Sequence, residues 1–511
     1  MDDLTPRLRA VCDLDVADQR ESSGRHEYDG KIQDLSPAGV RAGLARLAAA
    51  PAVDQPLADP HDEAHLATFE ERARVTFGQL ELHRRNPLYH LAELDLACYD
   101  RDYAPAEQRD HARLMHLAAW PPAVDAAIEA MDLVNAPVAT ALGGAVRGLA
   151  AAVPADADEQ AAAAAARAAH ARLMAHLDRA AAYGDPDAAL GAEALTALMS
   201  SAEGMPVDLG RLSERADAER DRLTARLAES CAQLDPGRPP GEVVRELARD
   251  HPDSGGVIEA ARHWTRLAIE FTRERDLVPY HDGECLVGLA PESRRWGMAM
   301  LAWAAPGETE GPSWYHITPP DPSWQPQEQE QWLEVFSTTS LPGITVHEVA
   351  PGHFSHGRAL RRAPSVVRRT LFSSAFVEGW AHYAEEVCVD EGFRAGDPRF
   401  AIGVWLGALI RVTRLACAIG MHTAGMTVRD GARRFESDAA LAGPAALAEA
   451  RRATFDPTYG RYTWGKLEIM DLREQARKRW GAGFSLRRFH AALLDLGSPP
   501  LGLLQTAVER G

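Results

Sequence analysis

The chain has little lysine and no excess of basic charge. Only three of its 55 basic residues are lysine (Lys31, Lys466 and Lys478), so arginine is the default cation. The 55 basic residues face 74 acidic ones, which gives a formal net charge of −19 over 511 residues. Proteins that bind nucleic acids need a basic footprint, so this balance argues against a nucleic-acid partner.

Cysteines and long apolar runs are also scarce. The six cysteines are scattered without CxxC spacing, which is typical of free thiols in a reducing compartment. The opening residues, MDDLTPRLRAVCDLD, are rich in acids and do not resemble a secretory signal. The most apolar segments, 138–152 and 406–421, are interrupted by Arg147, Arg411 and Arg414. We therefore expect a cytoplasmic protein without a membrane partner.

Motifs of two large enzyme classes are missing. There is no GxGxxG before a helix and no GxSxG. Residues Gly460 to Lys466 match the spacing of a phosphate-binding loop, but Leu467 replaces the hydroxyl residue that should bind magnesium. Nucleotide-dependent and serine-hydrolase functions therefore have no support.

The composition and periodicity of the sequence change at about residue 256. Residues 1–255 have alanine, leucine, arginine and glutamate at helical spacing, which predicts an N-terminal helical lobe. The following segment, GECLVGLAPESRRWGMAMLAWAAPGETEGPSWYHITPPDP, predicts short strands and turns, and helical patterns resume from about Gln327. We predict a mainly α-helical protein with two helical lobes around a groove and a small β-sheet. The second lobe, residues 256–511, would carry the chemistry.

The segment TTSLPGITVHEVAPGHFSH concentrates metal-binding side chains. Neutral imidazole and carboxylate oxygens are common zinc ligands, and His347, Glu348 and His353 stand within seven positions. In the metallopeptidase motif HExxH the histidines lie one helical turn apart, whereas here the second histidine comes two residues late. Six positions place it about 240° around a regular helix. Pro351 and Gly352 allow the turn to bulge and bring His353 beside His347.

A second segment, SSAFVEGWAHYAEE, supplies a further carboxylate. Catalytic zinc sites often take a glutamate as the third protein ligand and leave the fourth position open. Glu378 fits this role for one zinc ion. His382 lies one turn later and is interpreted as a residue that orients a ligand or touches substrate. His356 is interpreted as a histidine that is exposed to solvent or contacts a metal-ligating residue, and not as a metal ligand itself.

These motifs resemble a known family. HEVAPGH, VEGWAHYAEE and DPTYGRYTWGKLEIMDLR, together with GRHEYDGKIQDLSP and WYHITPPDPSW, resemble landmarks of the bacterial family called domain of unknown function 885. The resemblance extends over nearly the whole chain and implies a zincin-like fold of the gluzincin type, similar to thimet oligopeptidase and Taq-type carboxypeptidases. It implies His347, His353 and Glu378 as zinc ligands and Glu348 as the general base. It does not reveal the substrate.

Other candidates follow from the chemistry of amide hydrolysis. A tetrahedral intermediate needs a hydrogen-bond donor for its oxyanion, and related peptidases use a tyrosine from a later segment. We prefer Tyr462, with Tyr459 as the alternative. Candidates to bind a substrate carboxylate are Arg461, Lys466 and Arg473. The segment around His316 is a candidate substrate-binding edge.

The leading hypothesis is a zinc-dependent hydrolase that cleaves peptide or amide bonds of short substrates. One alternative is a specialised biosynthetic hydrolase that removes an aminoacyl or peptidyl group from a small-molecule intermediate. Another is a metal-binding helical scaffold without catalysis. Glu348 argues against the scaffold, because a structural zinc site closes all four positions and needs no base.

Overall fold

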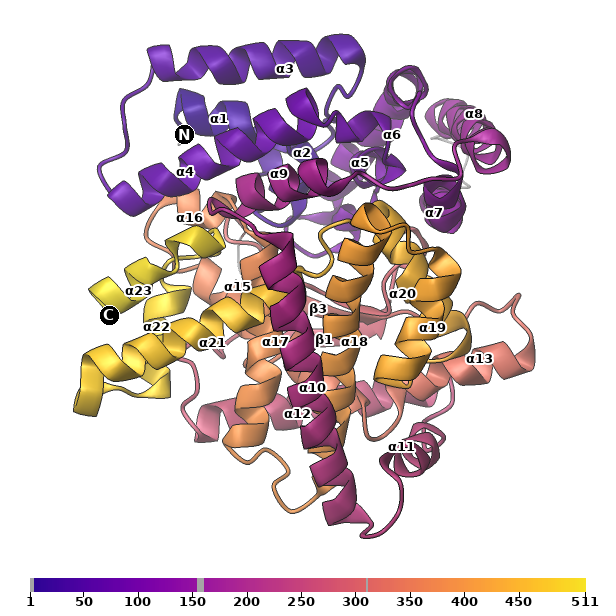
Figure 1. Cartoon of the computed structure of the whole chain (residues 1–511). Helices are drawn as coiled ribbons and strands as arrows, with labels where there is room; N and C mark the ends of the chain where they lie inside the picture. The colour runs from indigo at the N-terminus through magenta and orange to yellow at the C-terminus, as the bar shows by residue number, and fades with distance from the viewer. Residues whose placement is uncertain (1–3, 154–159, 309–310) are drawn as a thin grey trace.

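The computed structural model describes residues 4–153, 160–308 and 311–511. The protein is mainly helical, with 69% helix and one three-stranded sheet, as predicted. The N-terminal helices form the upper part of the molecule in Figure 1, and the remaining elements lie below them. The upper part contains α1 (Pro6–Cys12), α2 (Val16–Glu21), α3 (Pro37–Ala49), α4 (Pro60–Ala73), α5 (Pro87–Leu94), α6 (Ala106–Ala130), α7 (Ala136–Gly148), α8 (Gln160–Tyr183) and α9 (Ala192–Glu203).

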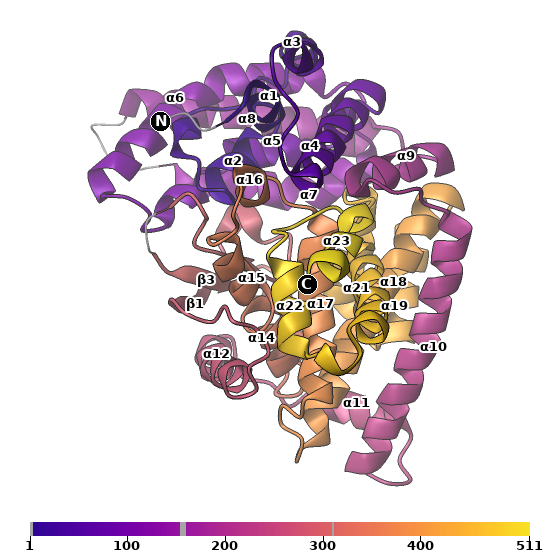
Figure 2. The same ribbon diagram turned by 90° about the vertical axis from the view of Figure 1, so that its left-hand side faces the viewer.

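The lower part begins with a long helix that runs along its outside. Figures 1 and 2 show α10 (Leu209–Leu234) packed lengthwise against α18 (Pro398–Thr423). The other helices of this part are α11 (Pro240–Ala248), α12 (Gly256–Glu274), α13 (Pro326–Leu333), α14 (Leu341–Glu348), α15 (His353–Leu360), α16 (Val366–Thr370), α17 (Ser374–Asp390), α19 (Val428–Ala439), α20 (Gly443–Phe455), α21 (Arg461–Trp480), α22 (Leu486–Leu494) and α23 (Gln505–Arg510).

The sheet contains β1 (Cys285–Leu289), β2 (Ala299–Ala302) and β3 (Ser313–Ile317) in the order β1-β3-β2. β3 is the central strand, parallel to β1 and antiparallel to β2. The buried Tyr315 is opposite Val287 on one side and Leu301 on the other. β2 is therefore an edge strand, and it packs beside α14.

The hydrophobic core divides the chain earlier than the predicted boundary at residue 255. Buried side chains from Leu195 to Val508 form one large core, whereas two smaller cores consist mainly of preceding residues, joined by Phe455 in one and by Val367 and Leu371 in the other. Helices α10 and α11, which lie before the predicted boundary, therefore pack with the second half of the chain. Their helical composition resembles that of the first half, so composition alone placed them there.

Two helices important for the site begin at caps encoded in the sequence. The Ser373 hydroxyl accepts a hydrogen bond from the Phe376 amide and caps α17. The Asp397 carboxylate caps α18, whose first residue is Pro398. Among the described residues, α18 is the one helix long and apolar enough to cross a membrane, but 61% of its apolar window is buried, as in a core helix.

Candidate metal centre

The segment between the two histidines interrupts the helix. α14 ends at Glu348, and α15 begins at His353, so the chain does not bulge within one helix but stops and restarts. Gly352 makes the tight turn possible, because a Cβ there would lie 1.9 Å from the carbonyl oxygen of His347. The indole of Trp380 in α17 donates hydrogen bonds to the carbonyls of Pro351 and Gly352. These contacts fix the turn against α17.

The break brings the three predicted ligands together. The rings of His347 and His353 have centroids 4.7 Å apart. Glu378 Oε2 lies 3.4 Å from His347 Nε2 and 3.3 Å from His353 Nε2. Both distances exceed those of a charge-assisted hydrogen bond. They match the separation of about 3.4 Å between two N/O ligands that each lie about 2.1 Å from a tetrahedral zinc ion. The three side chains therefore fit a divalent metal.

A buried carboxylate orients the first histidine. Glu385 Oε1 lies 2.6 Å from His347 Nδ1 and can only accept, so Nδ1 carries the proton and Nε2 is free to bind a metal. Arg411 contacts the same oxygen at 3.1 Å. Burial opposes ionisation of Glu385, but Arg411, His382 and His347 outweigh it and hold its pKa well below the usual value. Glu385 is therefore an anion in the folded protein.

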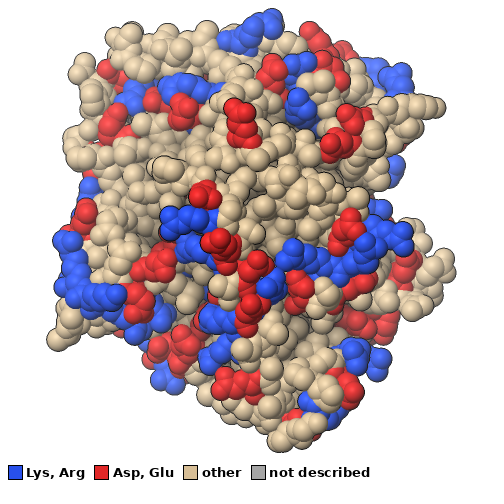
Figure 3. Space-filling model, viewed as in Figure 1, with Lys and Arg blue, Asp and Glu red and all other residues tan. Residues whose placement is uncertain are grey.

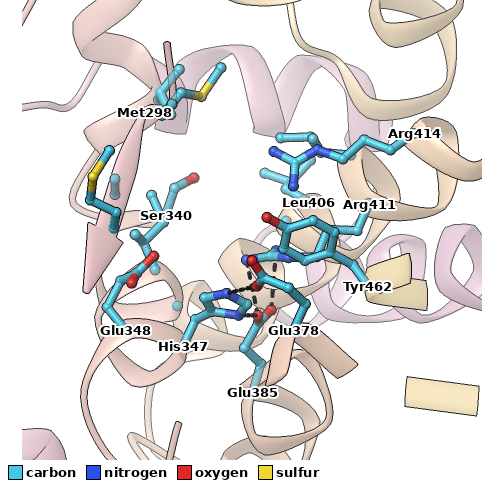
Figure 4. A pocket seen from close by; sticks show the side chains of 18 of the residues that line it. Met298, Ser340, His347, Glu348, Glu378, Glu385, Leu406, Arg411, Arg414 and Tyr462 are labelled. Carbon is cyan, nitrogen blue, oxygen red and sulfur yellow. Dashed lines mark hydrogen bonds and ion pairs between the residues drawn. The ribbon is translucent and has the colours of Figure 1, made fainter. Parts of the chain in front are cut away.

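Glu348 is the last residue of α14 and lines the same cavity as the histidines. Figure 4 shows its carboxylate on the other side of the His347 ring from Glu378. Burial raises the pKa of Glu348 to about 7, although the charge of His353 opposes the shift. Its Oε2 is buried without a hydrogen-bond partner among the described residues. A carboxylate in this setting can accept a proton at neutral pH.

The three ligand residues and Glu348 form part of the lining of a cavity of about 400 Å³. The edge strand β2 contributes Met300 and Leu301 to one wall, and α18 contributes Leu406 and Ile410. A wall built from α18, α20 and α21 carries arginine side chains and Tyr462. Apolar walls with a few converging polar groups are typical of sites for small ligands.

Tyr462 stands at the polar end of this cavity. Its ring stacks on that of His347, with centroids 6.2 Å apart and planes inclined by 21°. Its hydroxyl accepts a hydrogen bond from Arg452 Nη2 at 3.3 Å, so its own proton is free to be donated. Burial raises the pKa of Tyr462, and the phenol therefore stays protonated at neutral pH.

α21 reaches Glu378 because it packs closely on α17. A Cβ at Gly379 would lie 2.5 Å from Gly465 Cα, so the two helices meet at glycines. This close approach places Tyr462, at the start of α21, beside the ligands carried by α14 and α17.

The structure corrects three predicted roles near Tyr462. Tyr459 is fully buried, and its hydroxyl donates to the backbone carbonyl of Glu449, so it does not line the cavity. Lys466 is also fully buried and pairs with Glu219 and Glu386, at 2.9 and 2.6 Å. Arg473 contacts the hydroxyl of Tyr383 outside the cavity. The last two residues hold helices together and do not line the cavity.

The remaining candidates occupy other positions. His316 lies on the central strand β3 and does not line the cavity, whereas β2 does. His382 is buried behind the site, 3.6 Å from Glu385 Oε2. His356 is buried rather than solvated, within hydrogen-bonding distance of the carbonyl oxygen of Gly497. Arg461 does line the cavity, but both of its terminal nitrogens bind Asp456.

Several residues of the site were not found from the sequence. Glu385 lies seven residues after Glu378 on one face of α17, and this two-turn spacing was the available signal. Trp380 belongs to the recognised motif, but its bonds to the turn depend on tertiary contact. Arg411, Arg414 and Arg452 had no signal, because arginine is the default cation of this chain.

Comparison with known proteins identifies the family. Residues 18–508 match the family described as a bacterial protein of unknown function (DUF885). The chain belongs to this family. No curated protein matches it.

Two solved structures share the fold. One is of a "putative lipoprotein of unknown function" from Shewanella oneidensis, 19% identical, with a TM-score of 0.75 over 98% of this chain and 97% of that one. The other is of a "putative lipoprotein" from Colwellia psychrerythraea, 17% identical, with a TM-score of 0.78 over 99% and 97%. At these identities the likeness establishes the fold alone.

The comparisons overturn the predicted cytoplasmic location. Both structural neighbours are named as putative lipoproteins, a name that indicates a membrane-anchored or secreted location for those two proteins and contradicts the cytoplasmic prediction. The prediction relied on scattered cysteines and on the first residues of the sequence. Unpaired buried thiols do not distinguish compartments, since a protein with a large core is stable in either without disulfides.

Proposed function

We propose that this chain is a zinc-dependent hydrolase of peptide or amide bonds in short substrates. The supporting observation is the ligand geometry: two imidazole nitrogens lie 3.4 and 3.3 Å from one carboxylate oxygen, as expected around a tetrahedral ion. Three protein ligands leave a fourth position for water or substrate, as in catalytic zinc sites. A bound zinc ion would lower the pKa of water and polarise the scissile carbonyl.

The protein side chains supply the other steps. Glu348 accepts the proton of the attacking water and passes it to the leaving nitrogen. Tyr462 donates its hydroxyl proton in a hydrogen bond to the oxyanion, while Arg452 donates to the tyrosine oxygen. The free edge of β2 offers backbone groups to an extended substrate. The cavity of about 400 Å³ suits short substrates.

The test combines metal content with activity. We expect the purified wild type to hold about one zinc per chain by mass spectrometry and to cleave members of a short-peptide library. His353→Ala should lose the metal. Glu348→Gln should keep the metal and lose at least about 100-fold in rate, because only the base is removed.

Three outcomes contradict parts of the proposal. Full metal content in His353→Ala would exclude the proposed ligand set. Full activity in Glu348→Gln would exclude the proposed base. A zinc-loaded wild type that cleaves neither peptides nor N-acyl amino acids would contradict the hydrolase function itself.

A further inference from the structure

We propose that Arg414 binds a free carboxylate of the substrate, and that the chain cleaves amides close to a carboxylate end. This inference depends on the proposed hydrolase function and adds its substrate class. It replaces the predicted carboxylate-binding residues Lys466 and Arg473, whose charges are used in contacts outside the cavity.

The guanidinium of Arg414 has N–H donors that its ion pair with Glu449 does not use. Its Nε and Nη2 donate to the two oxygens of Glu449 at 2.7 and 2.6 Å. A guanidinium has five N–H donors, so this pairing leaves the end formed by Nη1 and Nη2 available for a second fork. Figure 4 shows the group pointing into the cavity above Glu378, near the hydroxyl of Tyr462. The side chain is only 11% exposed, which keeps the group in one orientation.

The wall around Arg414 has more positive than negative groups. The wall formed by α18, α20 and α21 has four guanidinium groups, which are paired with only three carboxylates. Arg411 pairs with Glu385, and Arg414 pairs with Glu449. Arg452 and Arg461 share Asp456. The wall therefore carries one cation in excess, in surroundings where charge interactions are strong. Of the other carboxylates that line the cavity, Glu348 and Glu378 belong to the proposed metal site, where a divalent ion would compensate them. Glu21 pairs with Arg294, and Glu334 lies outside this wall, directly after α13. An excess of one charge matches a carboxylate better than a doubly charged phosphate.

The position of Arg414 limits where cleavage occurs. The ring of Tyr462 contacts both Arg414 and the proposed ligand His347. Its centroid is 4.7 Å from Arg414 Cζ and 6.2 Å from the centroid of the His347 ring. The guanidinium is therefore at most about 11 Å from the ring of this ligand, a span of about three extended residues. A substrate held at Arg414 presents a bond within one to three residues of its carboxylate. This geometry favours removal of a short C-terminal piece over cleavage inside a long chain.

The experiment compares N-acetyl dipeptides that have apolar side chains and either a free C-terminal carboxylate or a carboxamide. For the zinc-loaded wild type we expect kcat/KM to favour the free acid by at least about tenfold, as expected for a charge-assisted pair. Arg414→Gln combined with Glu449→Gln removes the cation without leaving a buried unpaired anion. This double variant should abolish the preference by raising KM for the acid, with little change for the carboxamide.

Two matched variants separate binding from folding. Glu449→Gln alone keeps the Arg414 cation and should keep the preference for the free acid. Arg473→Gln removes an arginine outside the cavity and should change kcat/KM for neither substrate. A purely structural role for Arg414 would lower both rates together in the double variant. Such a result, or equal wild-type rates for the two substrates, would overturn this inference and leave the hydrolase proposal intact.

A binding measurement does not depend on turnover. Calorimetric titration of zinc-loaded Glu348→Gln with the same pair should give a dissociation constant for the acid at least about tenfold lower than for the carboxamide. Equal binding, or no binding of the acid, would overturn the carboxylate site whether or not the wild type cleaves either compound.

Discussion

Glu385 links the proposed metal ligands to the charged wall of the cavity. It contacts His347 Nδ1 on one side and Arg411 on the other, within a fully buried environment. Carboxylates that hold a metal-binding histidine fix its tautomer and raise its basicity. The carboxylate would therefore affect the affinity of the proposed metal site without being a ligand.

Glu385→Gln should weaken zinc binding by about 10- to 100-fold, because the amide holds the imidazole but lacks the negative charge. Competition with a chromophoric chelator measures the dissociation constant. Glu386→Gln is the matched control: it disturbs the neighbouring pairs with Lys466 and Arg222, not the histidine. Equal zinc affinity in the two variants would contradict the orienting role.

Single residues were predictable where their chemistry is rare and clustered. His347, His353 and Glu378 come together in the structure as the sequence predicted, because the closely spaced histidines have few other uses and Glu378 belongs to a second motif of the same family pattern. Lys466 and Arg473 were misjudged, because residue type does not reveal which neighbour a side chain faces. Arg473 lies three helical turns beyond Tyr462, too far along α21 to reach the same cavity.

At the level of elements, the break between α14 and α15 determines the ligand geometry. The sequence predicted a distortion at Pro351 and Gly352, because six positions on a regular helix separate the two rings. It did not predict the complete restart at His353, which depends on the tertiary bonds from Trp380. The short strands were predicted from texture, but their order was not, since strand pairing joins segments far apart in the chain.

Gly352→Ala should damage both the fold and the metal site. The added methyl would lie 1.9 Å from the His347 carbonyl oxygen, and the turn must move to accept it. We expect a loss of about 1–3 kcal/mol in the free energy of unfolding and at least about tenfold weaker zinc binding. Gly396→Ala, at an exposed position with nothing within 4 Å, is the control. Calorimetric melting and chelator competition report the two effects, and wild-type values in both would refute the role of Gly352.

On the scale of the whole molecule, the N-terminal helices cover the part that carries the site. On the face of the molecule that is seen in Figure 1, acidic and basic side chains are interspersed, and this face has no continuous basic surface (Figure 3). Glu203, at the end of α9, joins the two parts through buried contacts. Its Oε2 accepts hydrogen bonds from the Ser373 hydroxyl at 2.7 Å and from the Leu501 amide at 3.0 Å. The same serine caps α17, so this carboxyl group connects the N-terminal helices to the helix of Glu378.

Glu203 makes stability depend on pH across this junction. Burial raises its pKa to about 7 in the folded protein, against an ordinary value of about 4.5, although Ser373 and Leu501 oppose the shift. Between these two values the unfolded chain has lost the proton and the folded protein keeps it, so the contribution of Glu203 to stability falls as pH rises from about 4.5 to 7. Glu203→Gln imitates the protonated form and removes this dependence. We therefore expect the variant to gain up to about 3 kcal/mol in the free energy of unfolding, relative to the wild type, between pH 4.5 and pH 8.

Denaturant unfolding at both pH values measures the gain, with the exposed Glu214→Gln as control. A constant difference between variant and wild type would mean that Glu203 is already ionised in the folded protein, with Ser373 and Leu501 sufficient to hold the charge.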